Sequence, residues 1–246
     1  MQNDGYFDEK VASTYDDDVD SFSPEVINPV VDFLSELADG SNALEFGIGT
    51  GRIALPLALR GIEVHGIELS NAMIAKLAEK TGGDRIPVTQ GDFATTSCGG
   101  SFSLVYLIFN TIMNLTTQEQ QVRCFQNAAL HLSPGGSFVI EVIVPALQSL
   151  SHGETNHVFD FRDDHWGIDT YDVASQSLRS HHLRIRNQKV ELSSIPFRYV
   201  WPSELDLMAR IANLKLKARW GSWKKEPFTN TSRYHVSVWE KPHNEN

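Results

Sequence analysis

A run of glycines between a predicted strand and a predicted helix is the strongest chemical pattern in the sequence. Residues 44–52 (LEFGIGTGR) hold Gly47, Gly49 and Gly51, and Glu45 stands two residues before the first of them. Such a turn lets backbone N–H groups approach a ligand closely, and the helix N-terminus favours a carboxylate or phosphate. Glu45 can meet an ammonium group. The pattern therefore indicates a ligand that is zwitterionic at one end, like an amino acid.

Two further acids stand where the next two strands are expected to end. Glu68 lies 17 residues beyond Gly51, and its carboxylate can accept hydrogen bonds from the two hydroxyls of a ribose. Asp92, in QGDF, can accept from an exocyclic amine, and Phe93 can lie beside an adenine ring. A dinucleotide fingerprint needs a further glycine where this chain has Arg52, which disfavours an NAD-dependent oxidoreductase.

The elements that must position these residues alternate between strands and helices. Such alternation predicts an α/β fold with a doubly wound, mostly parallel, seven-stranded sheet. Pro24 suits a helix start, Asp39-Gly40 a helix end, and Ser203 a helix cap. We expect helices at 24–38, 52–59, 71–80, 117–132 and 201–214, and strands at 42–46, 62–67, 86–89, 103–109, 137–144, 215–221 and 233–241.

Between the two parts of this predicted sheet the pattern changes. Residues 157–161, 168–175, 178–186 and 189–200 alternate like antiparallel strands and predict an inserted β lid over the cofactor. The expected organisation is an N-terminal arm at 1–23 and an α/β cofactor-binding domain at 24–145 and 201–241. Residues 146–200 form the expected lid.

Charge is distributed unevenly along the 246 residues, whose formal net charge is −10. Residues 1–40 contain 11 acids and one base, Lys10, whereas the other acids and bases cancel. Without a basic excess the sequence argues against a nucleic-acid substrate. The acidic arm either steers a cationic substrate towards the site or is a solvated, solubilising segment.

Several other classes of protein are disfavoured. No apolar run approaches the length of about 20 residues that spans a bilayer, and the acidic N-terminus resembles neither a signal nor a transit peptide. The only cysteines, Cys98 and Cys124, cannot form a disulfide scaffold and suit a reducing compartment. We expect a cytoplasmic protein with no membrane or nucleic-acid partner, and a homo-oligomer is compatible with the sequence.

The ordered motifs resemble those of the class I S-adenosylmethionine-dependent methyltransferases. LEFGIGTGR resembles the first motif of that family, VHGIELS its ribose motif, QGDF its adenine motif and HLSPGGSFVIE its fifth-strand signature. The resemblance implies S-adenosylmethionine as the cofactor and a Rossmann-like fold. It also implies a cofactor site formed by Tyr6, Glu45, Gly47, Gly49, Gly51, Arg52, Glu68, Leu69, Met73, Asp92, Phe93 and Ile108.

The segment after the fourth strand of the sheet, residues 108–115, is similar to that of bacterial small-molecule N-methyltransferases of the aminosugar and lincosamide-antibiotic type. It lacks the Asn/Asp-Pro-Pro-aromatic motif of enzymes that methylate protein or DNA nitrogen. Aminosugar enzymes often have a histidine where Asn114 stands. Tyr6, Phe7 and Tyr15 resemble residues of an arm that closes over the cofactor in these relatives.

These observations predict methyl transfer to a small molecule, most plausibly to an amine nitrogen of a secondary metabolite. Tyr15 and Asn114 are the candidates for orienting the nucleophile, and no metal is expected. O- or C-methylation of a similar scaffold and a non-catalytic nucleotide-binding role are the alternatives. The residues expected at the substrate are Phe109, Asn110, Trp166 and Phe197.

Overall fold

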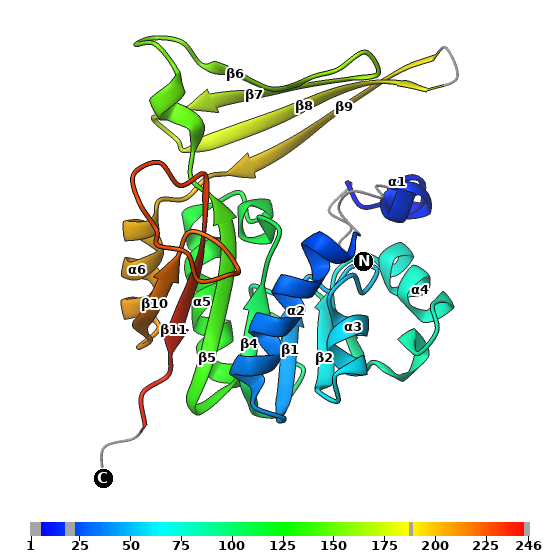
Figure 1. Cartoon of the computed structure of the whole chain (residues 1–246), viewed down its shortest axis with the longest axis vertical. Helices are drawn as coiled ribbons and strands as arrows, with labels where there is room; N and C mark the ends of the chain where they lie inside the picture. Colours follow the sequence, from blue (N-terminus) through cyan, green and yellow to red (C-terminus); the bar gives the residue numbers. More distant parts are fainter. Residues whose placement is uncertain (1–5, 18–22, 187–188, 244–246) are drawn as a thin grey trace.

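A seven-stranded sheet forms the body of the molecule (Figure 1). The computed structural model describes residues 6–17, 23–186 and 189–243. The strands follow the order β10-β11-β5-β4-β1-β2-β3, and only β11 runs antiparallel to its neighbours. This confirms the expected doubly wound, mostly parallel sheet. Its strands are β1 (Asn42–Phe46), β2 (Glu63–Glu68), β3 (Val88–Gln90), β4 (Phe102–Leu107), β5 (Leu132–Ile143), β10 (Lys215–Trp220) and β11 (Tyr234–Glu240).

The strand order changes direction beside β1. The chain passes outward from β1 to β2 and β3, and then returns to the other side of β1 with β4. Ligands of doubly wound sheets bind outside the carboxyl ends of the strands at such a switch point. The glycine turn that follows β1 lies at this point in the sheet.

Helices cover both faces of the sheet because its central strands are apolar on both sides. On β4, Leu104 and Tyr106 belong to one hydrophobic cluster, whereas Val105 and Leu107 belong to the other. The first cluster includes side chains of α2 (Pro24–Ala38), α3 (Ala54–Leu59) and α4 (Asn71–Glu79). The second includes α5 (Gln118–His131) and α6 (Pro202–Ile211). The continuous apolar pattern of a buried parallel strand is therefore explained.

Helix ends mostly agree with the signals in the sequence. Pro24 occupies the first turn of α2, and Asp39 ends that helix in the left-handed conformation. The expected cap at Ser203 is wrong: α6 begins at Pro202, and Trp201 precedes it without a side-chain cap. The Trp201 side chain offers no acceptor oxygen, so the N–H groups of Glu204 and Leu205 donate instead to the Trp201 carbonyl, each at 3.0 Å.

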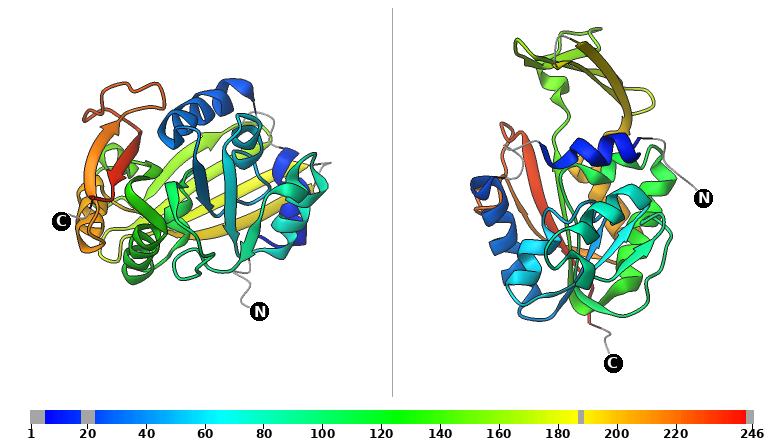
Figure 2. Two further views of the ribbon diagram at one scale, coloured as in Figure 1. Left: turned by 90° about the horizontal axis from the view of Figure 1, so that it is seen from below. Right: turned by 90° about the vertical axis from the view of Figure 1, so that its right-hand side faces the viewer.

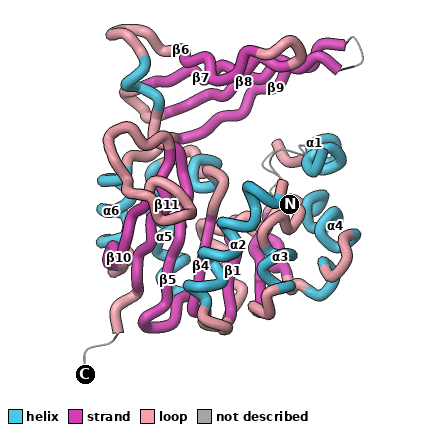
Figure 3. The backbone as a smooth tube through the Cα atoms, in the orientation of Figure 1, coloured by secondary structure: helices cyan, strands magenta, loops and turns pink. Residues whose placement is uncertain are grey.

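A separate four-stranded antiparallel sheet lies beyond one end of the body (Figures 1 and 3). It consists of β6 (Asn156–Phe161), β7 (His165–Asp172), β8 (Ser177–Arg186) and β9 (Lys189–Arg198), in that order. We call this sheet the lid. β7 begins at His165, three residues earlier than expected, so Trp166 belongs to a strand.

The N-terminal arm lies between the lid and α4 (Figure 2). It contains a short helix, α1 (Glu9–Thr14), followed by a single 3₁₀ turn at Tyr15–Asp17. Asp8 caps α1 by accepting from the backbone N–H of Val11 at 2.9 Å. The sequence patterns did not predict this helix, because six residues are too few for a periodic signal.

No helix in the described ranges is both long enough and apolar enough to cross a membrane.

Substitution of Gly51 by alanine tests how tightly the glycine turn packs against α4. A Cβ at Gly51 would lie 2.4 Å from Cδ1 of Leu77, whereas one at Gly40 would meet nothing within 4 Å, and both residues have positive φ. We expect Gly40→Ala to cost about 1–2 kcal/mol from backbone conformation alone. Gly51→Ala should cost about 1–3 kcal/mol more from overpacking. Urea unfolding of both variants measures the difference, and equal losses would contradict this packing.

Candidate functional site

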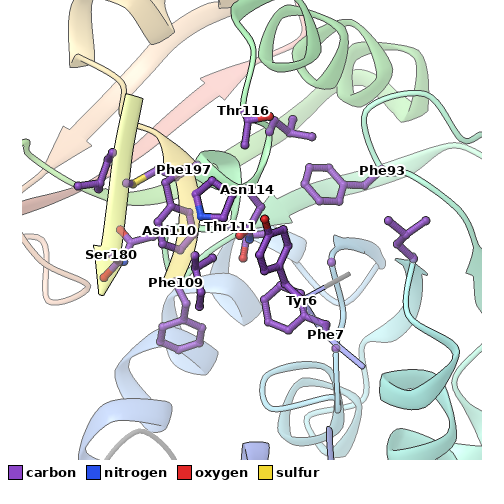
Figure 4. A pocket seen from close by; sticks show the side chains of 18 of the residues that line it. Tyr6, Phe7, Phe93, Phe109, Asn110, Thr111, Asn114, Thr116, Ser180 and Phe197 are labelled. Carbon is purple, nitrogen blue, oxygen red and sulfur yellow. The ribbon is translucent and has the colours of Figure 1, made fainter. Parts of the chain in front are cut away.

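A cavity of about 870 Å³ lies between the carboxyl end of the sheet, the lid and the arm. Side chains from all three parts converge on it (Figure 4). Of the predicted residues, those that line it are Tyr6, Tyr15, Gly47, Gly49, Glu68, Leu69, Met73, Asp92, Phe93, Phe109, Asn110, Asn114 and Phe197.

The glycine turn forms one wall of this cavity. Gly47 has a φ of 69°, and a Cβ there would lie 2.9 Å from Cγ2 of Thr111. Gly49 has a φ of 55°, and the nearest atom to a Cβ there would be 3.9 Å away. Only glycine adopts this backbone and leaves the wall open. Gly51 corrects the sequence expectation, because it packs behind the turn against Leu77 and does not line the cavity.

Glu68 is buried, and its carboxylate ties the turn to the next helix. Oε2 accepts from the N–H of Gly49 at 2.9 Å, and Oε1 accepts from the N–H of Ser70 at 2.8 Å. The Ser70 hydroxyl accepts from the N–H of Met73 and so caps α4. An ionised carboxylate has about four acceptor sites. Glu68 can therefore keep these bonds and still accept from ligand hydroxyls.

Glu45 and Arg52 line a second, small cavity of about 40 Å³ that adjoins the first. Burial raises the pKa of Glu45 to about 8, even though the Tyr106 hydroxyl donates to it at 3.0 Å. A cation beside Glu45 would lower that pKa again. Arg52 lies over the ring of Phe109, with its guanidinium carbon 4.0 Å from the centroid. Ile108 lines this small cavity, not the large one.

Asp92 and Phe93 stand together at the end of the third strand of the sheet. One Asp92 oxygen, Oδ1, accepts from the N–H of Ala94 at 2.8 Å, which fixes the carboxylate at the cavity edge. The Phe93 ring stacks on Phe46, with centroids 5.9 Å apart. Leu69 and Met73 supply apolar surface to the same cavity. This combination of an acceptor and apolar surface suits a purine with an exocyclic amine.

The arm is held against the glycine turn by several polar contacts. Arg52 donates to the Tyr15 hydroxyl at 3.0 Å, and Thr50 donates to Asp16 at 2.7 Å. Lys80 makes an ion pair of 2.6 Å with Asp16. Part of the acidic arm therefore has a structural function, which the sequence patterns did not reveal. Tyr6, Phe7 and Tyr15 consequently cover the cavity from the arm side.

The loop after β4 has an unusual backbone. Phe109 and Asn110 have φ values of 53° and 63°, a region that bulky residues avoid. Glu141 on β5 stabilises this loop by accepting from the N–H of Phe109 at 2.7 Å, and Oδ1 of Asn110 accepts from the N–H of Ile143 at 2.8 Å. Burial raises the pKa of Glu141 to about 7. Sequence reasoning missed Glu141, which lies inside an otherwise apolar strand.

Of three other predicted residues, Asn114 and Phe197 line the cavity, whereas Trp166 does not. Asn114 lines the cavity, and among the described residues its side chain has no hydrogen-bond partner. Phe197 enters the cavity from the lid. Trp166 corrects the sequence expectation: it is 41% exposed and stacks on Phe161, outside the cavity. Strand alternation explains this, because its neighbours His165 and Gly167 take the inner face.

The inner face of the lid carries polar groups that sequence reasoning did not find. Asp169 and Ser180 are paired across β7 and β8 and line the cavity. Asp169 is 8% exposed, and its Oδ1 has no hydrogen-bond partner among the described residues. Burial raises its pKa. Within the described ranges, no group of three or more His, Cys, Asp or Glu side chains is arranged so that it could hold a metal ion.

The chain resembles known methyltransferases in sequence and in structure. Residues 43–136 match the family model described as a methyltransferase domain. The cypemycin N-terminal methyltransferase of a Streptomyces species is 28% identical over 208 residues, which cover 82% of this chain and 84% of that protein. The CcbJ methyltransferase of Streptomyces caelestis is 33% identical, with a TM-score of 0.86 over 98% of this chain and 100% of that chain.

A third relative shares the fold at lower identity. The amino pentose methyltransferase CalS10 of Micromonospora echinaspora is 21% identical, with a TM-score of 0.66 over 88% of this chain and 90% of that chain.

The sheet order, the glycine cradle and the acids at successive strand ends are those of a nucleoside-binding α/β protein. The chain belongs to the class I S-adenosylmethionine-dependent methyltransferases. Its cofactor is S-adenosylmethionine, and the methyltransferase interpretation is favoured over an oxidoreductase or a non-catalytic protein.

Replacing Glu68 tests the centre of this site. Glu68→Ala removes a carboxylate that holds the glycine turn and faces the cavity. Hydrogen bonds to charged groups contribute about 1.5–3 kcal/mol each, so affinity for S-adenosylmethionine should fall about 10- to 100-fold. Calorimetric titration measures this loss. Glu63→Ala is the control, since that side chain is 75% exposed on the same strand. Unchanged affinity in Glu68→Ala would contradict the assignment.

Proposed function

We propose that this protein transfers the methyl group of S-adenosylmethionine to an amine nitrogen of a small-molecule secondary metabolite. The observation that carries the proposal is Asp169. Its carboxylate is buried on the inner face of the lid, lines the cavity and has an oxygen without a hydrogen-bond partner among the described residues. Burial raises the pKa of the Asp169 carboxyl because it disfavours the charged form, and an ammonium group beside it would stabilise that charge.

The charges around the cavity support a cationic acceptor. Among the described residues that line it, Glu68, Asp92 and Asp169 are acidic, and none is Lys or Arg. Glu68 and Asp92 lie at strand ends, where we assign them to the ribose and the adenine. Asp169 belongs to the lid, so its charge remains available for the acceptor. An anionic acceptor, such as a carboxylate, would find no positive partner there.

The relatives also favour nitrogen as the acceptor atom. One is named for methylating the N-terminus of cypemycin, and another is named as an amino pentose methyltransferase. These acceptors share an amine and little else. We therefore assign the chemical class of the acceptor and not its scaffold.

The residues that line the two cavities support the following assignment of cofactor contacts. Glu68, Leu69 and Met73 hold the ribose side, while Asp92 and Phe93 hold the adenine. Tyr6 and Tyr15 cover the cofactor from the arm. At the methionine end we assign Glu45, Gly47, Gly49, Arg52 and Ile108, which line the small cavity at its junction with the large one.

Catalysis in this site depends on position and on exclusion of water. S-adenosylmethionine supplies a methyl group that is already activated by a sulfonium sulfur. The protein must hold the acceptor nitrogen in line with that methyl group and keep water out. Asn114 has an uncommitted amide, and the Tyr15 hydroxyl is fixed by Arg52, so we assign both to orienting the nucleophile. Phe109, Asn110 and Phe197 form the adjoining substrate wall.

A panel of acceptors tests the amine assignment directly. The panel contains aminosugars, prolinamide and short peptides with a free N-terminus, each beside a phenol and a carboxylate of similar size. With labelled S-adenosylmethionine, we expect label in amines only. Labelling of phenols or carboxylates with no labelled amine would replace the proposal by O-methylation.

Asp169→Asn tests the counter-ion, because it keeps the shape of the side chain and removes its charge. We expect the KM of an amine acceptor to rise at least tenfold, since the ammonium loses its buried partner. Affinity for S-adenosylmethionine should not change. Asp163→Asn, an exposed aspartate of the lid, is the matched control. A KM equal to that of the control would argue against Asp169 as the binding group.

Tyr15→Phe and Asn114→Ala test the orienting residues. Each should lower kcat far more than it lowers affinity for S-adenosylmethionine, because alignment of the nucleophile is lost while the cofactor contacts stay. Turnover assays and calorimetry on the same samples separate the two effects. Parallel losses of turnover and of cofactor affinity would refute this role.

A further inference from the structure

The lid contains a chain of hydrogen-bonded side chains that begins in the cavity and ends at its outer edge. His182 on β8 lines the cavity. Its Nδ1 lies 2.9 Å from Nε2 of His165, and Nδ1 of His165 lies 2.6 Å from a carboxylate oxygen of Asp160. Asp160 in turn makes an ion pair of 2.6 Å with Arg162, whose side chain is 62% exposed. His182, His165 and Asp160 thus connect the cavity to the exposed side chain of Arg162.

The two imidazoles meet end to end. Their planes differ by 6°, and their centroids are 5.2 Å apart. Each ring nitrogen lies about 1.1 Å from the centroid of its own ring. The N···N distance of 2.9 Å and these two distances together span the whole centroid separation only when both nitrogens lie on the line between the centroids. The two rings are therefore coplanar and in line. That is the geometry of an N–H···N hydrogen bond along which a proton can pass.

Strand alternation and a bulge place these residues on one face of the lid. His165 and Gly167 share the inner face of β7, and His182 is paired with Gly167. The β6–β7 register shifts between Val158 and Asp160, which adds one residue to β6 there. Such a bulge redirects side chains, and it allows Asp160 to reach His165.

Gly167 has no side chain, and this leaves room for the Phe159 ring beside the two histidines. A Cβ there would lie 2.3 Å from the Phe159 ring. Phe159 packs edge-on against His182 and lies close to His165, with centroids 5.5 and 6.4 Å away. The Phe159 ring therefore covers part of both imidazoles, while Phe159 itself remains 43% exposed.

The hydrogen bonds also determine where the protons lie. Hydrogen bonds from Arg162 hold the pKa of Asp160 below its usual range, so Asp160 is a carboxylate and only accepts. A neutral His165 that donates from Nδ1 to Asp160 accepts at Nε2. In that arrangement His182 donates from Nδ1, and its Nε2, 3.3 Å from the Ser180 hydroxyl at the cavity, carries no proton. An unprotonated nitrogen then faces the acceptor site.

The environment of His182 keeps this nitrogen available. Burial lowers the pKa of His182 to about 4, and the nearby positive charge of Arg184 acts in the same direction. The imidazole is therefore neutral at pH 7. On β9 its paired residue, Ser193, does not titrate. Among the described residues, the titratable and charged groups around His182 are Arg184 and His181 on its own strand, His165 and Asp169 on β7 and Asp160 on β6.

The proposed function creates a need for such a chain. A carboxylate that holds an ammonium raises the pKa of that ammonium, but only a neutral amine can attack the methyl group. Asp169 lies on the same face of the lid as His182. Binding through Asp169 therefore works against reaction unless the excess proton has a way out.

We propose that His182, His165 and Asp160 form a proton exit, which carries one proton of the bound ammonium from the cavity to solvent. The proposal rests on the proposed amine acceptor. His182 accepts the proton at Nε2, directly or through Ser180, and passes its Nδ1 proton to Nε2 of His165. The Nδ1 proton of His165 passes to Asp160 and then to water. Exchange of the ring protons with water between turnovers restores the starting tautomers.

Nitrogen NMR of the full-length protein, labelled with ¹⁵N-histidine, tests the proton positions without any acceptor. At pH 7 we expect His182 to show a protonated Nδ1 and a bare Nε2, with the resonance assigned by its loss in His182→Gln. In Asp160→Asn the preference for this tautomer should be lost. A proton on Nε2 of His182 in the unaltered protein would overturn the proposal.

The turnover rate with the amines of the acceptor panel tests whether protons leave through His182, His165 and Asp160. His182→Gln keeps the size and a donor to His165 but cannot relay a proton. We expect kcat at pH 7 to fall about 10²-fold, with an unchanged affinity for S-adenosylmethionine. The loss should disappear as the pH rises towards the pKa of the acceptor ammonium. Asp160→Asn, whose side chain lies outside the cavity lining, should show the same profile.

His181→Gln is the matched control, because His181 lies next to His182 on the same strand and its Nδ1 contacts Ser194. It should keep the pH profile of the unaltered protein. If amines are methylated and His182→Gln also keeps that profile, the proton exit is overturned while the proposed function stands. If no amine is methylated, the proposed function fails and the proton exit fails with it.

Discussion

The carboxylate of Glu68 is the interaction on which the arrangement of the site depends. It accepts from the N–H of Gly49 in the glycine turn and from the N–H of Ser70 at the start of α4. The Ser70 hydroxyl then donates to the carbonyl of Phe7 in the arm at 2.5 Å. Glu68 thus joins the glycine turn after β1 to the end of β2 and, through Ser70, to the N-terminal arm. Three segments distant in sequence are held around one ligand position, which is the preorganisation that a positioning enzyme requires.

Strain is concentrated in the loop after β4, which lines the same cavity. Phe109 and Asn110 occupy a backbone region that costs about 1–3 kcal/mol per residue unless surrounding bonds enforce it. Glu141 and the N–H of Ile143 provide those bonds. The strained conformation turns the chain sharply at the end of β4, so that the Phe109 ring lies beneath the Arg52 guanidinium. The loop after β4 and the helix-side residue Arg52 are therefore coupled through the side chain of Phe109.

The sheet and the cofactor site were predictable from the sequence to a greater extent than the lid. Glycines, acids at strand ends and continuous apolar strands follow from backbone geometry, and each leaves a local pattern. The lid was predicted less accurately. The expected start of β7 was three residues too late, which left Trp166 outside the strand. Strand alternation could therefore not show which face of the lid the Trp166 side chain takes. Asp160 reaches the inner face through a bulge, which no period of two predicts. Glu141 was hidden because its partner is a backbone N–H, 32 residues away in the sequence.

The polar face of the lid reflects a conflict that any amine methyltransferase must resolve. A buried carboxylate such as Asp169 selects a cation, yet the cation is unreactive until it loses a proton. Water could remove that proton, but water must be kept out of the site. The proposed proton exit would resolve the conflict, because the hydrogen-bonded imidazoles of His182 and His165 would pass a proton along without admitting water. On this proposal the lid supplies the group that binds the amine and the path by which its proton leaves, whereas the arm and the loops at the end of the sheet hold the cofactor and orient the nucleophile.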